Sequence, residues 1–311
     1  MKTNISLILI LCLLLGACKN GNASSQSKSE TPQDTIKAIK MPAIPQMMTA
    51  PEQRADFLAK HYWDNVNFAD TNYIHHPEVT EQAWADYCDL LNHVPLETAQ
   101  QAMRNVIDRT NVDKKVFTYI TDLADKYLYD PNSPMRNEEF YIPVLEAMIA
   151  SPVLNETEKI RPQARLKLAQ KNRIGTKALN FTYTLASGAQ GSLYQLKAEY
   201  LLLFINNPGC QACTETIEGL KNAPIINQLL QEKKLVLLSI YPDEELDEWK
   251  KHLSEFPNEW INGYDKKFTI KEKQLYDLKA IPTLYLLNKE KTVLLKDATA
   301  QAIEEYLMIH Q

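Results

Sequence analysis

Residues 200–213 read YLLLFINNPGCQAC, and this stretch decides the fold of the C-terminal half of the chain. The near-continuous apolar run 200–206 is typical of a strand that is buried on both faces of a sheet. The turn residues 206–209 end this strand, and Cys210 and Cys213 then lead into a helical segment. A helix N-terminus stabilises a thiolate through its free N–H groups and positive dipole end, and cysteines spaced in this way can close a disulfide. The stretch therefore predicts a reactive cysteine pair between a buried strand and a helix.

Strand and helix patterns alternate through the rest of residues 174–311. Apolar and polar residues alternate over 181–185, and largely apolar runs of strand length follow at 235–241, 282–287 and 292–295. Helical patterns occur after Cys213 with a kink near Pro224, around Trp249, over 268–278 and over 300–308. The sequence Ala280-Ile281-Pro282-Thr283 stands directly before one of these strands. This order of elements predicts an α/β fold.

Taken together, these residues resemble the TlpA/ResA-like family of membrane-anchored thioredoxins across most of 175–311. The resemblance implies a thioredoxin-like fold in which Pro282 is cis and faces the CxxC motif. The backbone at Ile281, Pro282 and Thr283 would then pair with an extended substrate. It further implies a thiol–disulfide oxidoreductase, with Cys210 as the nucleophile and Cys213 as the resolving cysteine. The redox-active Cys210–Cys213 disulfide would be the reacting group, with no cofactor and no metal.

Two positions depart from the family pattern. Gly209 stands where family members usually have Trp before the first cysteine, and Phe204 stands where thioredoxin has a buried acid. The residue that accepts the proton of the resolving cysteine is therefore unassigned. Glu215 and Glu218 follow Cys213 on the same predicted helix and are the candidates, although both also fit a solvated helix face.

Two other functions fit part of this sequence. A peroxiredoxin would need the pattern P-x-x-x-T-x-x-C, and neither Cys210 nor Cys213 is preceded by it. A non-enzymatic adaptor could carry Cys210 and Cys213 as a static structural disulfide, and a redox potential below about −300 mV would suit such a bond. The leading hypothesis is a reductase that acts on disulfides of other envelope proteins. A reductase role fits this resemblance, while the sequence leaves the substrates, the membrane electron donor and the direction of electron transfer open.

The preceding residues 51–173 predict an all-α domain. No glycine occurs between residues 22 and 174, and apolar residues recur there at helical spacing in five or six segments. Asn155 and Glu158 have the spacing of a capping box. This region resembles, more loosely, a helical domain of unknown function that precedes thioredoxin domains in some bacterial lipoproteins. Cys88 lies on an apolar helical stripe and is predicted to be an inert buried thiol.

The N-terminus has the pattern of a secreted, lipid-anchored protein. Residues 1–17 hold one basic residue and an eleven-residue apolar run, which is too short to span a bilayer and is typical of a signal peptide. The sequence Leu15-Gly16-Ala17-Cys18 resembles a bacterial lipobox, which implies that Cys18 is lipidated. Residues 18–50 are polar at first and then contain prolines, as expected for a flexible tether. We therefore expect a periplasm-facing protein held to the membrane of the cell envelope by its N-terminal lipid.

Charge and histidine content limit the remaining classes of function. The formal net charge of −5 argues against a surface that follows nucleic-acid phosphates. His61, His75, His76 and His93 lack the spacing of a metal site, and one CxxC supplies only two of the four ligands of a structural zinc site. We therefore expect protein disulfides or dithiols as partners, and neither nucleic acid nor metal.

Overall fold

The computed structural model describes residues 38–310, and these residues belong to one compact unit. The predicted signal peptide 1–17, Cys18 and most of the predicted tether lie outside the described residues. Within 38–310, no helix combines the length and the apolar character that a membrane crossing requires.

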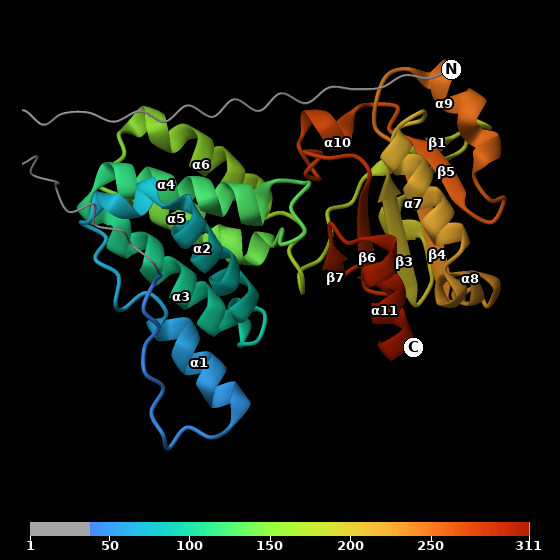
Figure 1. The fold of residues 1–311 in the computed structure, drawn as a ribbon. Helices are drawn as coiled ribbons and strands as arrows, with labels where there is room; N and C mark the ends of the chain where they lie inside the picture. The colour runs from blue at the N-terminus through green and yellow to red at the C-terminus, as the bar shows by residue number, and fades with distance from the viewer. Residues whose placement is uncertain (1–37, 311) are drawn as a thin grey trace, which may run out of the picture. The chain divides into compact units, whose positions relative to one another are not determined.

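The first part of the described chain is helical, as predicted (Figure 1). Asn155 and Glu158 form the predicted capping box at the start of the last of these helices. A single apolar core runs through the region and contains the large side chains of Trp84, Tyr87 and Phe117. The helices are α1 (Pro51–His61), α2 (Pro77–Leu91), α3 (Leu96–Arg109), α4 (Lys114–Ala124), α5 (Glu138–Ala150) and α6 (Glu156–Ala169).

The C-terminal end of the predicted tether is not separate from this core. Ile39 packs against the apolar core of the helical region, and the carbonyl of Lys40 accepts a hydrogen bond from Asn65 at 2.9 Å. Residues 39 and 40 of the predicted tether therefore contact the helical region. The apolar side chain of Ile39 is more stable packed against the helices than exposed to water.

A seven-stranded mixed sheet forms the second part, in the order β2-β1-β5-β4-β3-β6-β7. The strand β3 pairs in parallel with β4 and antiparallel with β6. All but its first residue are buried, which explains the continuous apolar run in the sequence. The strands are β1 (Thr182–Leu185), β2 (Gln190–Ser192), β3 (Tyr200–Ile205), β4 (Leu235–Tyr241), β5 (Ile261–Tyr264), β6 (Thr283–Asn288) and β7 (Val293–Lys296).

Each face of this sheet carries its own apolar core. The helices α7 (Gln211–Lys221), α8 (Pro224–Gln231) and α11 (Ala300–His310) lie on one face (Figure 1). Their apolar side chains pack against β3. On the other face, the segment before β1 and the short helix α10 (Thr269–Glu272) cover the sheet. The helix α9 (Leu246–His252) lies between β4 and β5 in the chain. This is the thioredoxin-like architecture that the sequence predicts.

Three elements differ from the expectation. The predicted helix over 268–278 is confined to α10, because Phe268 and Gln274 both adopt a left-handed backbone conformation at its two ends. The strands β2 and β5 were not predicted, because each is short and contains a glycine, Gly191 in β2 and Gly263 in β5. A Cβ at Gly263 would lie 2.9 Å from the Tyr183 ring, so the close approach of β1 to β5 requires glycine there.

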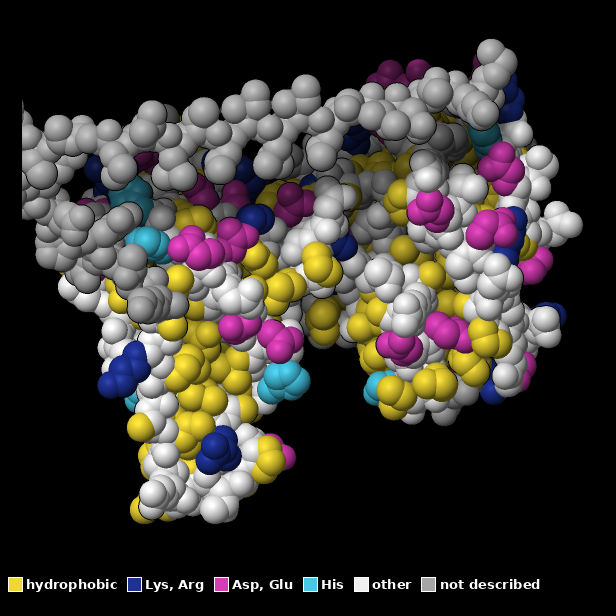
Figure 2. Space-filling view, in the orientation of Figure 1, with side chains coloured by type: hydrophobic (Ala, Val, Ile, Leu, Met, Phe, Trp, Pro, Cys, Tyr) yellow, Lys and Arg dark blue, Asp and Glu magenta, His cyan; other side chains and the backbone are white. Residues whose placement is uncertain are grey.

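Figure 2 shows hydrophobic side chains gathered over α1 and α3, while acidic and basic side chains are interspersed elsewhere on this face.

Candidate functional site

The CxxC motif lies at the start of α7, directly after the loop that follows β3. Cys210 is the N-cap residue of α7 and has an extended backbone conformation. Its carbonyl accepts a hydrogen bond from the Thr214 N–H at 3.0 Å, which starts the helical bonding pattern. The Cys210 side chain is partly exposed, so its sulfur is accessible from solution. The free N–H groups of the first helical turn follow this sulfur in the chain and favour negative charge near it.

Gly209 explains one departure from the family pattern. Its φ is +71°, a conformation that glycine adopts without steric penalty and that other residues rarely adopt. A Cβ added there would meet no atom within 4 Å, so the backbone conformation, and not crowding, requires glycine. Tryptophan at this position would be strained in the loop that this chain forms.

The Ile281–Pro282 peptide bond is cis and lies beside the CxxC motif. The Sγ atom of Cys210 is 3.8 Å from the carbonyl oxygen of Ile281. The two motifs meet because β3 and β6 are antiparallel neighbours, with Ile205 at the end of β3 opposite Thr283 at the start of β6. The structure therefore brings together four of the predicted site residues, Cys210, Ile281, Pro282 and Thr283, although they are far apart in the sequence.

Cys213 occupies a different environment from Cys210. It is 2% exposed, and burial raises the pKa of its thiol to about 12. A backbone hydrogen bond from Asn207 lowers this pKa, and the neighbouring Cys210 thiol raises it further. At neutral pH the Cys213 thiol is therefore protonated, while both cysteines are free thiols in the structure.

The candidate proton acceptors Glu215 and Glu218 make other contacts on the exposed face of α7. Phe204, at the position of the buried acid in thioredoxin, is itself fully buried and packs edge-on against Trp260. Glu215 accepts a hydrogen bond from Gln211, and Glu218 pairs with Lys221, and both glutamates are exposed. The two glutamates therefore lie on a solvated helix face, which was the alternative to a role as proton acceptor.

A buried group of charges lies under the cis-proline loop, and sequence reasoning missed it. Lys279 contacts both Asp277 and Asp297, and Asp297 accepts a hydrogen bond from the Thr283 hydroxyl at 2.7 Å. Burial acts to raise the pKa of Asp297, but Lys279 and Arg136 outweigh it and hold the pKa below its usual value. These residues are distant in the sequence from the CxxC motif, and no known motif marks them.

The other candidates from the sequence lie elsewhere. Cys88 is buried on α2, and burial raises the pKa of its thiol to about 12. His61 and His76 hydrogen-bond to Asp64 and Glu78, which lie close by in the chain. Within the described chain, no group of three or more His, Cys, Asp or Glu side chains is arranged to hold a metal ion.

Comparisons with known protein families match the helical region and the sheet region separately. Residues 17–172 match the family described as Domain of unknown function (DUF5106), and residues 198–293 match the family described as Thioredoxin-like. No curated protein matches the chain.

Solved structures include similar chains from the genus Bacteroides. A thioredoxin-like protein from Bacteroides caccae is 86% identical, with a TM-score of 0.87 over 89% of this chain and 100% of its own. The C-terminal domain of an uncharacterized protein from Bacteroides fragilis is 71% identical over 44% of this chain and 98% of its own, with a TM-score of 0.44. The thioredoxin domain of a thiol-disulfide oxidoreductase from Bacteroides vulgatus is 21% identical over 43% of this chain and 98% of its own, with a TM-score of 0.39. The chain therefore belongs to the family of thioredoxin-like proteins that carry an N-terminal DUF5106 domain.

Proposed function

We propose that this protein is a thiol–disulfide oxidoreductase whose reacting groups are Cys210 and Cys213. The observation that carries the proposal is the position of the Cys210 sulfur. It lies at the N-cap of α7, is partly exposed, and is 3.8 Å from the carbonyl of Ile281 at the cis proline. An extended peptide that pairs with the backbone at 281 would place its own disulfide beside this sulfur.

The reaction begins with the reduced pair. The Cys210 thiolate attacks one sulfur of a partner disulfide, and the other partner sulfur leaves as a thiolate. Cys213 then loses its proton to solvent and attacks the Cys210 sulfur. This step forms the Cys210–Cys213 disulfide and releases the second partner thiolate. Two electrons pass from this protein to the partner, and an external dithiol must return them before the next cycle.

The proposal extends to a TlpA/ResA-like reductase that works in the cell envelope. The Ile281-Pro282-Thr283 sequence and the CxxC motif support the family, and the family supports reduction as the direction. We assign Ile281, Pro282 and Thr283 to substrate binding, Cys210 to attack and Cys213 to resolution. The partners would be envelope protein disulfides or dithiols, with a membrane dithiol protein as the electron donor.

Trapping of the mixed disulfide tests the two cysteine roles. Cys213→Ser should accumulate a mixed disulfide with a disulfide-bonded test protein, because attack occurs and resolution does not. Cys210→Ser should form almost none, and Cys88→Ser should behave like the parent. The measurement is non-reducing electrophoresis with mass spectrometry of the linked peptides.

Two results would contradict this assignment. Trapping by Cys210→Ser but not by Cys213→Ser would reverse the two roles. No trapping by either variant, together with a Cys210–Cys213 potential below about −300 mV, would favour a static structural disulfide.

We further propose that the protein is anchored by a lipid on Cys18 and faces the periplasm. The support is the lipobox-like sequence 15–18 and the polar segment that follows it. Metabolic labelling with a tagged fatty acid should mark the parent and Cys12→Ala, in which the other N-terminal cysteine is changed. It should not mark Cys18→Ala, and equal labelling of that variant would refute the anchor.

A further inference from the structure

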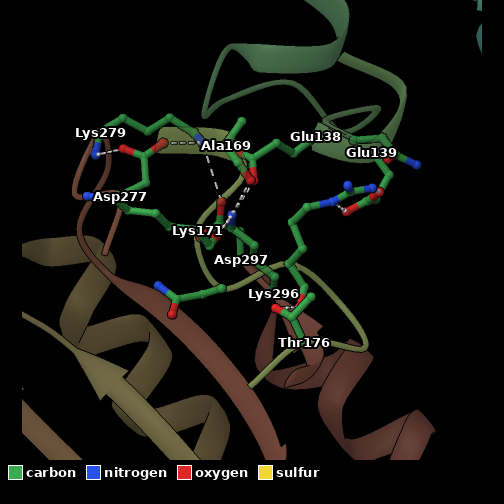
Figure 3. Close-up of polar contacts among 12 residues, drawn as sticks. Glu138, Glu139, Ala169, Lys171, Thr176, Asp277, Lys279, Lys296 and Asp297 are labelled. Atoms are coloured by element: carbon green, nitrogen blue, oxygen red, sulfur yellow. Dashed lines mark hydrogen bonds and ion pairs between the residues drawn. The ribbon is translucent and has the colours of Figure 1, made fainter. Parts of the chain in front are cut away.

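The helical region contacts the sheet region beside the loop that carries the cis proline. Glu138 is the first residue of α5, and its side chain is only 12% exposed. Its carboxylate lies 3.5 Å from the Lys279 ammonium and also pairs with Lys296 at the end of β7. Figure 3 shows these acidic and basic side chains gathered in one cluster.

The same cluster fixes both ends of the predicted substrate loop 280–283. The Lys279 ammonium, just before the loop, lies 2.8 Å from Asp277 and 3.4 Å from Asp297. The Thr283 hydroxyl, at the end of the loop, donates to Asp297 at 2.7 Å. Asp297 thus connects the two ends, and its carbonyl accepts a second contact from the helical region, the Arg136 guanidinium at 2.6 Å.

Charge balance shows why the helical region matters to this cluster. Lys279 and Lys296 are 12% and 6% exposed, and a buried ammonium is stable only when it is paired. Asp277 and Asp297 both contact Lys279. The carboxylate that pairs with Lys296 comes from Glu138, and the other Lys296 contacts are the carbonyls of Ala169 and Lys171. Loss of the Glu138 charge would leave Lys296 to compete for the carboxylates that hold Lys279.

We propose that Glu138 is a positioning residue of the redox site: it holds Lys279 and Asp297 in place and thereby fixes the backbone of Ile281 and Thr283 that receives the substrate. This inference rests on the proposed function, and it assigns a role in substrate binding to the helical domain. Glu138 does not touch the substrate. It acts through Lys279, Asp297 and Thr283.

The test compares Glu138→Gln with Glu139→Gln in the full chain. Glu139 is a matched control, because it is the next residue of α5 and is similarly buried at 13% exposed. Its carboxylate pairs with Arg173 and accepts from Gln100, outside the Lys279–Asp297 cluster. Both substitutions remove one buried carboxylate charge and keep the shape of the side chain.

Three readouts separate positioning from a general loss of structure. In Glu138→Gln, hydrogen exchange of the peptide 277–284 should accelerate by about tenfold, and KM for a peptide disulfide should rise by about tenfold. The rate at which iodoacetamide alkylates Cys210 should stay at the parent value, because the sulfur itself is not moved. Glu139→Gln should leave KM and the exchange of 277–284 at the parent values.

A double variant tests the route of the effect. Thr283→Val removes the hydrogen bond to Asp297, which lies on the route from Glu138 to the loop. The KM of the double variant should therefore rise by less than the product of the increases in the two single variants. If Glu138→Gln does not fold, Arg136→Met reaches the same Asp297 from the helical region and should also accelerate exchange of 277–284. Equal effects of Glu138→Gln and Glu139→Gln, or unchanged exchange in Glu138→Gln, would overturn the proposal. Hydrogen exchange needs no turnover, so a parent protein without reductase activity would refute the proposed function alone.

Discussion

The helical region and the sheet region each bury one cysteine, and the two thiols differ in their surroundings more than in their acidity. Cys88 and Cys213 are both 2% exposed, and burial raises the pKa of each to about 12. Cys88 packs in an apolar core on α2, whereas Cys213 lies one helical turn after the partly exposed Cys210. Burial by itself therefore makes a thiol inert. The accessible thiol of Cys210 nearby is the feature that distinguishes Cys213 from Cys88.

The largest effect that tests this contrast is the loss of the accessible thiol. Cys210→Ser should lower the rate of disulfide reduction by at least about a thousandfold, or ~4 kcal/mol in the barrier, because a hydroxyl does not replace a thiolate nucleophile. Cys88→Ser is the control and should keep the parent rate. A similar loss of rate in both variants, measured by reduction of a peptide disulfide, would remove the distinction between the two regions.

Alkylation at different pH values tests the acidity of the buried thiols. At pH 8 a thiol with a pKa of about 12 is a thiolate in about one molecule in ten thousand, so Cys88 and Cys213 should react far more slowly than Cys210. Their rates should rise about tenfold for each pH unit, as long as the fold persists. Iodoacetamide labelling followed by peptide mass spectrometry measures each cysteine separately. Fast labelling of Cys213 at pH 8 would contradict its burial.

The same pKa values predict how stability depends on pH. Both thiols have a folded pKa above that of an unfolded cysteine, so the folded state keeps protons that the unfolded state loses. Their contribution to the free energy of unfolding is therefore complete below the unfolded pKa and is lost as the pH rises toward about 12. Replacing Cys88 with alanine should flatten this loss, as measured by urea unfolding between pH 8 and pH 10.

Substitutions of Gly209 and Gly219 in the sheet region should change the stability by smaller amounts, and in opposite directions. Gly209→Ala should destabilise the fold by about 1–2 kcal/mol, because its left-handed backbone disfavours a side chain. Gly219→Ala lies inside α7, where the new Cβ would make an ordinary contact at 3.6 Å, and should stabilise by about 0.5–1 kcal/mol. Urea unfolding measures both changes. Destabilisation by Gly219→Ala would show that α7 is packed more tightly than the structure has it.

Another small effect belongs to the helical region. Asn155→Ala removes the cap of α6 and should destabilise by about 1 kcal/mol, because the Glu158 N–H loses its acceptor. The rate of Cys210 alkylation should not change, since α6 lies outside the CxxC site. A change in that rate would show that the helical region influences the sulfur itself and not the substrate loop alone.

Local patterns in the sequence predicted those parts of the structure that are set by residues close together in the chain. The apolar run 200–206 predicted the buried strand β3, and the capping box predicted the start of α6. The position of Cys210 at a helix N-terminus followed from the turn residues before it. The strands β2 and β5 were not predicted, because three or four residues that include a glycine carry too little periodicity.

Only the tertiary structure decided what surrounds the cysteines. The fold places Ile281 beside Cys210 through the pairing of β3 with β6, a contact that the resemblance had to supply at the level of sequence. It also assembles Glu138, Lys279 and Asp297 from three distant segments, because buried charges are stable only in pairs and the chain must fold to bring the partners together. Single charged residues carry no periodic signal in a sequence. The sequence by itself therefore determined the helices, the strands and the cysteine motif. Tertiary packing decided which buried charges pair beside the site.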